Sequence, residues 1–82
     1  MSSGLDLGVG LPTRTPEDLG AVLAHARREA GLDQSELAEW VSMNREYVGE
    51  LERGAHATRL IRIFTILDAL GLEIVVRRRQ VP

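Results

Sequence analysis

The chain has 82 residues, is 44% hydrophobic and 27% charged, carries a formal net charge of −2 and contains no cysteine. This length fits one small domain with a modest core, for which association with a second copy would add stability. The composition excludes disulfides and thiolate metal sites, and no apolar run reaches the roughly 18 residues of a membrane span. The N-terminus lacks the basic and apolar regions of a secretion signal. We therefore expect no membrane segment and a reducing, cytoplasmic setting.

Residues 1–14 are rich in glycine, which predicts a flexible N-terminal arm. Thr15 then provides an N-cap, and Pro16 suits the first position of a helix. Apolar residues recur at helical spacing until Gly31, a helix stop. These signals predict a helix over residues 16–30.

Two short helices follow, separated by a tight turn. Asp33 and Glu36 form a capping-box pattern at the start of a helix that ends near Val41. Asn44 is an N-cap candidate for the next helix, which Gly54 ends. Such a pair is typical of a helix-turn-helix unit, whose second helix enters the major groove of DNA. Many helix pairs bind nothing, so the spacing alone does not decide the function.

The last third of the chain predicts a helix over 58–70 and then a short β-branched strand, 72–76. A lone strand must pair with a second subunit or with another part of this chain, or it does not form at all. Three successive arginines make residues 77–82 a basic tail, which would be a solvated end or a surface for DNA or an acidic protein. The domain itself is expected to cover residues 15–76.

The stretch GLDQSELAEWVSMNREYVGELERG, 31–54, resembles the helix-turn-helix unit of the Xre/Cro family of bacterial and phage repressors. The matching residues are Gly31, Leu32, Gln34, Leu37, Ala38, Leu51, Glu52, Arg53 and Gly54. The flanking stretches RTPEDLGAVLAHARREAGLDQSELA and ILDALGLEIVV are similar to the HipB-type antitoxin branch, so the resemblance spans 14–76. It implies an all-α, lambda-repressor-like domain of four to five helices with a C-terminal strand that pairs across a dimer.

The resemblance also implies a function. It implies a homodimeric, nucleoid-associated repressor of bacterial or phage type that binds a palindromic operator in double-stranded DNA. The HipB branch further implies an antitoxin that autoregulates its operon and binds a HipA-like kinase toxin. Two alternatives stay open: a stand-alone Xre-family regulator without a toxin, and a protein-interaction module that has lost DNA binding. No metal site is expected, because His25 and His56 lack further ligands at suitable spacing. No enzyme or cofactor site is expected either, because no serine has a base and an orienting group placed for it and no glycine loop precedes a helix in a phosphate-binding pattern.

By the same resemblance, the first turn of the second short helix faces the bases. The predicted DNA-binding residues are Gln34, Ser35, Asn44, Arg45, Glu46, Tyr47, Gly49, Glu50 and Arg59. Alternatives remain: Arg45 would bind a guanine or a phosphate, and Glu46 would accept from cytosine or lie beside the groove. Tyr47 would pack in the core or bind a phosphate. Gly49 departs from the longer polar residue common in the family, but it is expected at an exposed position.

Other residues receive structural roles. Arg27 and Glu52 are implied to form an ion pair between the first and third helices, which would remove Glu52 from the DNA-facing surface. Trp40, at a position that is often polar in the family, would cover the edge of the core or mark a partner surface. Arg14 is a further candidate for a phosphate contact. The residues expected at the dimer interface are Phe64, Leu67, Leu72, Ile74 and Val76.

Overall fold

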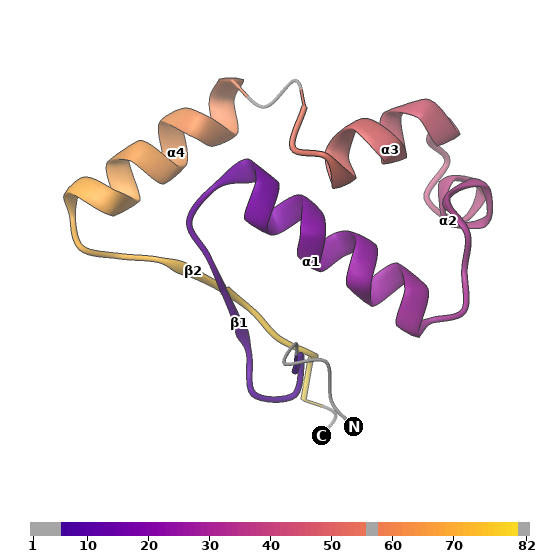
Figure 1. Cartoon of the computed structure of the whole chain (residues 1–82), viewed down its shortest axis with the longest axis horizontal. Helices are drawn as coiled ribbons and strands as arrows, with labels where there is room; N and C mark the ends of the chain where they lie inside the picture. Colours follow the sequence, from indigo (N-terminus) through magenta and orange to yellow (C-terminus); the bar gives the residue numbers. More distant parts are fainter. Residues whose placement is uncertain (1–5, 56–57, 81–82) are drawn as a thin grey trace.

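The computed structural model describes residues 6–55 and 58–80. Its elements are β1 (Leu11–Thr13), α1 (Pro16–Glu29), α2 (Gln34–Trp40), α3 (Arg45–Glu52), α4 (Thr58–Ala69) and β2 (Ile74–Val76). The four predicted helices are confirmed, and Figure 1 shows α1 in the centre, with α4 beside its start and α2 beside its end. Within these residues no helix is long and apolar enough to cross a membrane. His56 lies outside the described residues, as do 1–5 of the expected arm and 81–82 of the expected tail.

Side-chain caps explain where the first three helices begin. The hydroxyl of Thr15 accepts from the backbone N–H of Asp18 at 3.0 Å. Asp33 starts α2 with a complete capping box, in which its carboxylate and that of Glu36 each accept a backbone N–H of the other residue, at 2.8 and 2.9 Å. Each cap satisfies N–H groups that have no partner within the helix.

Two glycines let α1 approach the end of α3. A methyl group on Gly20 would lie 2.4 Å from the carbonyl oxygen of Glu52, so any larger residue would push the helices apart. Gly54 follows α3 with a φ of 73°, and a methyl group there would lie 2.8 Å from the backbone nitrogen of Glu17. Only glycine adopts this conformation without strain at such close contact.

A small antiparallel sheet joins the two ends of the chain. Strand β2 pairs with β1, with Leu11 opposite Val76 and Thr13 opposite Ile74. The C-terminal strand therefore has a partner within the same chain, which occupies one edge of β2, and pairing across a dimer stays a prediction. The sequence left pairing within the chain open, and the structure shows it.

The expected N-terminal arm is part of the fold from residue 6 onward. Leu7 and Leu11 are buried and pack with Val22 of α1. Thr13 is fully buried, and its hydroxyl donates to the carbonyl of Ile74 at 3.1 Å. The arm prediction is wrong for this segment because its sparse leucines supply apolar surface that α1 needs.

The expected basic tail is likewise tied to the fold at one point. The backbone N–H of Arg78 donates to the carbonyl of Leu7 at 2.9 Å, and its guanidinium binds Glu29 at the end of α1. Arg14, a candidate for phosphate contact, instead lies 3.3 Å from the carboxylate of Glu73. Both pairs are largely solvated, so they position the chain ends rather than supply much stability.

Candidate nucleic-acid interface

Helices α2 and α3 are joined by a four-residue turn, 41–44. The turn closes when the N–H of Met43 donates to the carbonyl of Ala38 at 2.9 Å, while Ser42 takes a positive φ of 56°. Asn44 begins α3, and its side-chain oxygen accepts from the N–H of Tyr47 at 2.7 Å. This oxygen is therefore occupied by capping, which leaves the amide NH₂ of Asn44 as the group able to meet a ligand.

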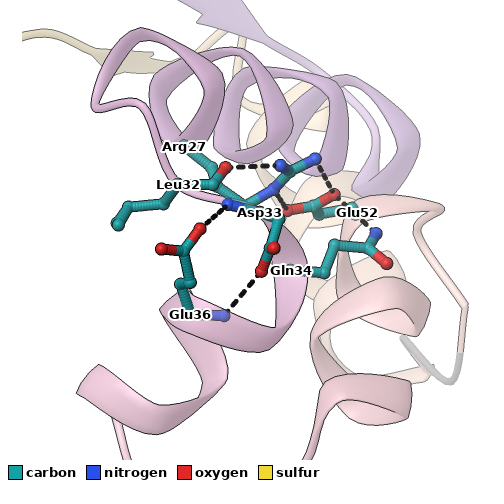
Figure 2. A network of polar contacts seen from close by, with 6 residues as sticks. All are labelled: Arg27, Leu32, Asp33, Gln34, Glu36 and Glu52. Carbon is teal, nitrogen blue, oxygen red and sulfur yellow. Dashed lines mark hydrogen bonds and ion pairs between the residues drawn. The ribbon is translucent and has the colours of Figure 1, made fainter.

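A polar network fixes α3 against α1 and α2 (Figure 2). The guanidinium of Arg27 donates to both carboxylate oxygens of Glu52, at 2.7 and 3.2 Å, and to the carbonyl of Leu32 at 2.8 Å. The side chains of Arg27 and Glu52 are only 11% and 7% exposed. A bidentate ion pair fixes both the distance between the two side chains and their relative orientation. It therefore holds α3 at a fixed angle to α1.

Electrostatics within this network favour the ionised pair. Burial alone raises the pKa of the Glu52 carboxyl, but hydrogen bonds from Arg27 and Gln34 outweigh it and hold that pKa below its ordinary value. The hydrogen bond to Glu52 raises the pKa of Arg27 above its ordinary value. Glu52 is therefore a structural carboxylate, charged but shielded from the surface that α3 presents.

Gln34, at the start of α2, belongs to the same network. Its side-chain NH₂ donates to Glu52 at 2.9 Å, and the residue is half-buried. An amide NH₂ carries two hydrogens, so one donor remains for a contact outside the chain. The sequence predicted Gln34 as a DNA-binding residue and missed this link to the ion pair.

Gly49 is buried, contrary to the expectation of an exposed position. A methyl group there would lie 3.3 Å from the guanidinium of Arg53 and 3.5 Å from the amide of Gln34. These two side chains therefore cover most of the glycine, so it offers little surface of its own. Gly49 instead makes room for Arg53, an exposed residue that the predicted interface did not include. Arg45, Gly49 and Arg53 recur every four residues and so share one face of α3. This spacing is the sequence signal that could have added Arg53 to the predicted interface.

The structure brings several of the predicted DNA-binding residues to one surface. A polar depression of about 320 Å³ on this surface is lined by Gln34, Arg45, Glu46, Gly49, Glu50 and Arg53. Ser35 and Arg45 line an adjoining depression, and Tyr47 is 44% exposed rather than packed in the core. Arg59 lies apart from both depressions, exposed in the first turn of α4. The described residues hold no group of three or more histidines and carboxylates that could bind a metal.

The residues predicted for dimerisation do not form one exposed face. Phe64 is buried within the chain, while Leu67, Ile74 and Val76 are half-buried. Leu72 is the most exposed of the five, at 56%. Most of this predicted interface is therefore occupied by contacts inside a single chain.

The chain is similar to known helix-turn-helix proteins over most of its length. Residues 18–80 match the family described as "Helix-turn-helix domain". The uncharacterized HTH-type transcriptional regulator y4mF of Sinorhizobium fredii is 31% identical over 61 residues, which cover 74% of this chain and 80% of that protein. An uncharacterized HTH-type transcriptional regulator of Methanothermobacter thermautotrophicus is 45% identical over 47 residues, covering 57% of this chain and 68% of that protein. No solved structure matches the chain at a significant level.

Proposed function

Because the chain belongs to the helix-turn-helix domain family, we propose that it is a sequence-specific DNA-binding transcriptional repressor. The observation that carries this proposal is the surface of α3, where Arg45, Arg53 and the free donor of Gln34 surround one polar depression. The N-terminal turn of α3 is exposed on a helix whose angle is locked by the Arg27–Glu52 pair. A rigid helix with an exposed first turn is what reading base edges in the major groove requires.

In this proposal one group of residues contacts the DNA phosphates and positions the protein, while another contacts the base edges. Gln34, Ser35 and Arg59 bind phosphates, which fixes the register of the protein on the duplex. Arg45 donates in bidentate fashion to a guanine, the commonest specific contact of an arginine in the major groove. Glu46 either accepts from a cytosine amino group or lies beside the groove.

The net charge of −2 does not oppose this proposal. One carboxylate of α3, that of Glu52, is only 7% exposed and is neutralised by Arg27. Affinity for phosphates depends on where the arginines lie rather than on the sum over the chain. On the surface of α3, Arg45 and Arg53 line the same depression as Glu46 and Glu50, so contacts to phosphates there would come from the individual arginines rather than from a local excess of positive charge.

The repressor is proposed to act as a homodimer on a palindromic operator, with its two copies of α3 about 34 Å apart. The similarity of residues 14–38 and 66–76 to HipB-type antitoxins further supports an antitoxin that autoregulates its operon and binds a HipA-like kinase toxin. A kinase-like reading frame beside the gene would favour this role over a stand-alone Xre-family regulator. A protein-interaction module without DNA binding is the remaining alternative, and the large exposed apolar surface favours it.

Binding to the DNA upstream of the gene, measured at several salt concentrations, tests the proposal. The wild-type protein should lose affinity steeply as salt increases, because phosphate contacts release counterions. Arg45→Ala should bind all sequences with similar affinity, whereas Arg59→Ala should weaken every sequence alike and lower the salt slope. Absence of binding to any upstream fragment at low salt would leave the interaction module as the better description.

A further inference from the structure

An open apolar groove lies between the C-terminal half of α1 and the helix pair α2–α3. It has a volume of about 400 Å³, and its apolar lining includes Leu23, Leu37, Trp40, Val41, Met43 and Leu51. The charged residues that line it, Arg27 and Glu52, neutralise each other. Trp40 is 73% exposed at this groove, an unusual exposure for the largest apolar side chain. The groove therefore suits an uncharged apolar occupant.

Helix α4 carries an apolar face that nothing in the described part of the chain covers. Ile63, Ile66 and Leu70, the residue that follows the last one of α4, are 47%, 60% and 66% exposed. Their spacing of three and four residues puts them on one side of the helix. Phe64 is the buried residue of α4, and it points to a different side. The helix is therefore apolar on two sides, and only one side has a partner among the described residues.

The helix α4 of the same chain cannot fill this groove in the observed fold. Phe64 and Ile61 lie with Thr15, Pro16 and Glu17 at the start of α1, whereas the groove adjoins the later half of that helix. Figure 1 shows this separation, with α4 at one end of α1 and α2 at the other. The chain that follows α4 is also held in place, because β2 is hydrogen-bonded to β1.

The chain exposes more surface than a compact protein of its mass, enough to accommodate a partner as large as a second copy. The chain exposes 6320 Å², whereas a compact protein of 9.1 kDa exposes about 4,900 Å². The excess of about 1,400 Å² is larger than the roughly 800 Å² that each partner of a stable complex buries. The radius of gyration, 13.6 Å, also exceeds the roughly 12 Å expected of a compact chain of this length.

We propose that a second copy of this chain fills the groove. The face formed by Ile63, Ile66 and Leu70 of each protomer docks into the groove of its partner, which gives two equivalent contacts around a two-fold axis. A groove and a helix face on the same chain that are both apolar and both uncovered satisfy the self-complementarity that such symmetry demands. The inference rests on the proposed homodimer and specifies its interface. Its test uses no DNA, so its failure is distinguishable from a failure of DNA binding.

The first test compares two substitutions on neighbouring positions of α4. Ile66→Glu places a carboxylate on the docking face, where burial of an unpaired charge opposes association. Thr65→Glu makes the same change of charge about 100° away around the helix. Both positions are exposed in the single chain, so both variants should retain the helical circular dichroism of the wild type. Sedimentation should give twice 9.1 kDa for the wild type and Thr65→Glu, and 9.1 kDa for Ile66→Glu, whose dissociation constant rises at least about 100-fold.

The second test follows the groove directly, because Trp40 is the single tryptophan of the chain. Its emission should move to shorter wavelength as the wild-type concentration passes through the dissociation constant, and should stay at long wavelength in Ile66→Glu. Met43→Glu, on the groove side, should give the same monomeric mass as Ile66→Glu. A wild-type protein that stays monomeric throughout the micromolar range would overturn the proposal. The proposal would also be overturned if Ile66→Glu and Met43→Glu both remained dimeric. It would equally be overturned if Trp40 emission did not change as the wild-type protein dimerises.

Discussion

Replacing Arg27 by alanine tests how the recognition helix is held. The guanidinium makes three hydrogen bonds, two to the carboxylate of Glu52 and one to the carbonyl of Leu32. Without it, the carboxylate keeps the amide of Gln34 as its hydrogen-bond donor within the network of Figure 2. Because the Glu52 side chain is 7% exposed, water cannot readily replace the missing partner.

The free energy of unfolding that Arg27→Ala is expected to lose is large relative to the stability of the domain. Breaking a buried ion pair from one side costs about 3–5 kcal/mol, because a charge is left without its partner. A domain of this length has about 4–12 kcal/mol of stability in total. The midpoint of thermal unfolding should therefore fall by about 12 °C or more.

Thermal and urea unfolding of Arg27→Ala and Arg28→Ala provide the measurement. Arg28 is the exposed neighbour on the same helix, so its substitution should change stability by less than about 0.5 kcal/mol. In the double variant of Arg27→Ala and Glu52→Ala, the loss should be smaller than the sum of the two single losses. Equal stability of Arg27→Ala and Arg28→Ala, with damage from Glu52→Ala alone, would refute the pairing.

Three further predictions concern the packing around this pair and the sheet. Gly20→Ala should destabilise the domain by about 1–3 kcal/mol, although alanine has the better helix propensity. The added methyl group would lie 2.4–2.5 Å from the carbonyl oxygens of Leu51 and Glu52. Urea unfolding measures this change in stability. Glu52 has a folded pKa below its unfolded pKa, so its contribution is complete above about pH 5 and is lost as pH falls through the folded pKa. The stability difference between wild type and Glu52→Gln should accordingly be constant at neutral pH and shrink in acid, whereas a constant difference down to pH values of about 2 would contradict the assignment. Thr13→Val should lose about 1 kcal/mol with its hydrogen bond to Ile74, and an unchanged urea midpoint would show that this bond contributes nothing.

The helices could be predicted from the sequence because their ends are encoded locally. Thr15, Asp33 and Asn44 are N-caps in the structure, as their positions before apolar repeats predicted. Gly31, the predicted stop of the first helix, follows α1 with a positive φ of 75°. Each of these signals involves residues within a few positions of one another, so they do not depend on the tertiary structure.

The sheet and the surface of α3 could not be predicted in this way. Strand β1 has three residues, includes Pro12, and pairs with a strand about 60 positions later, so it leaves no periodic signal. The second role of Gln34 and the burial of Gly49 depend on where Arg53 and Glu52 lie once the helices have packed. The spacing of Arg45, Gly49 and Arg53 places them on one face of α3, but it does not show which side chains cover one another there.

Selection of bound sequences from a random DNA pool tests the central claim most directly. The operator sequence need not be identified beforehand, and the enriched pool reports binding, specificity and geometry together. A dimeric repressor that reads DNA with α3 should enrich a palindrome whose half-sites are about 10 base pairs apart, centre to centre. A pool that stays random after repeated rounds at low salt, where phosphate contacts are strongest, would contradict the account.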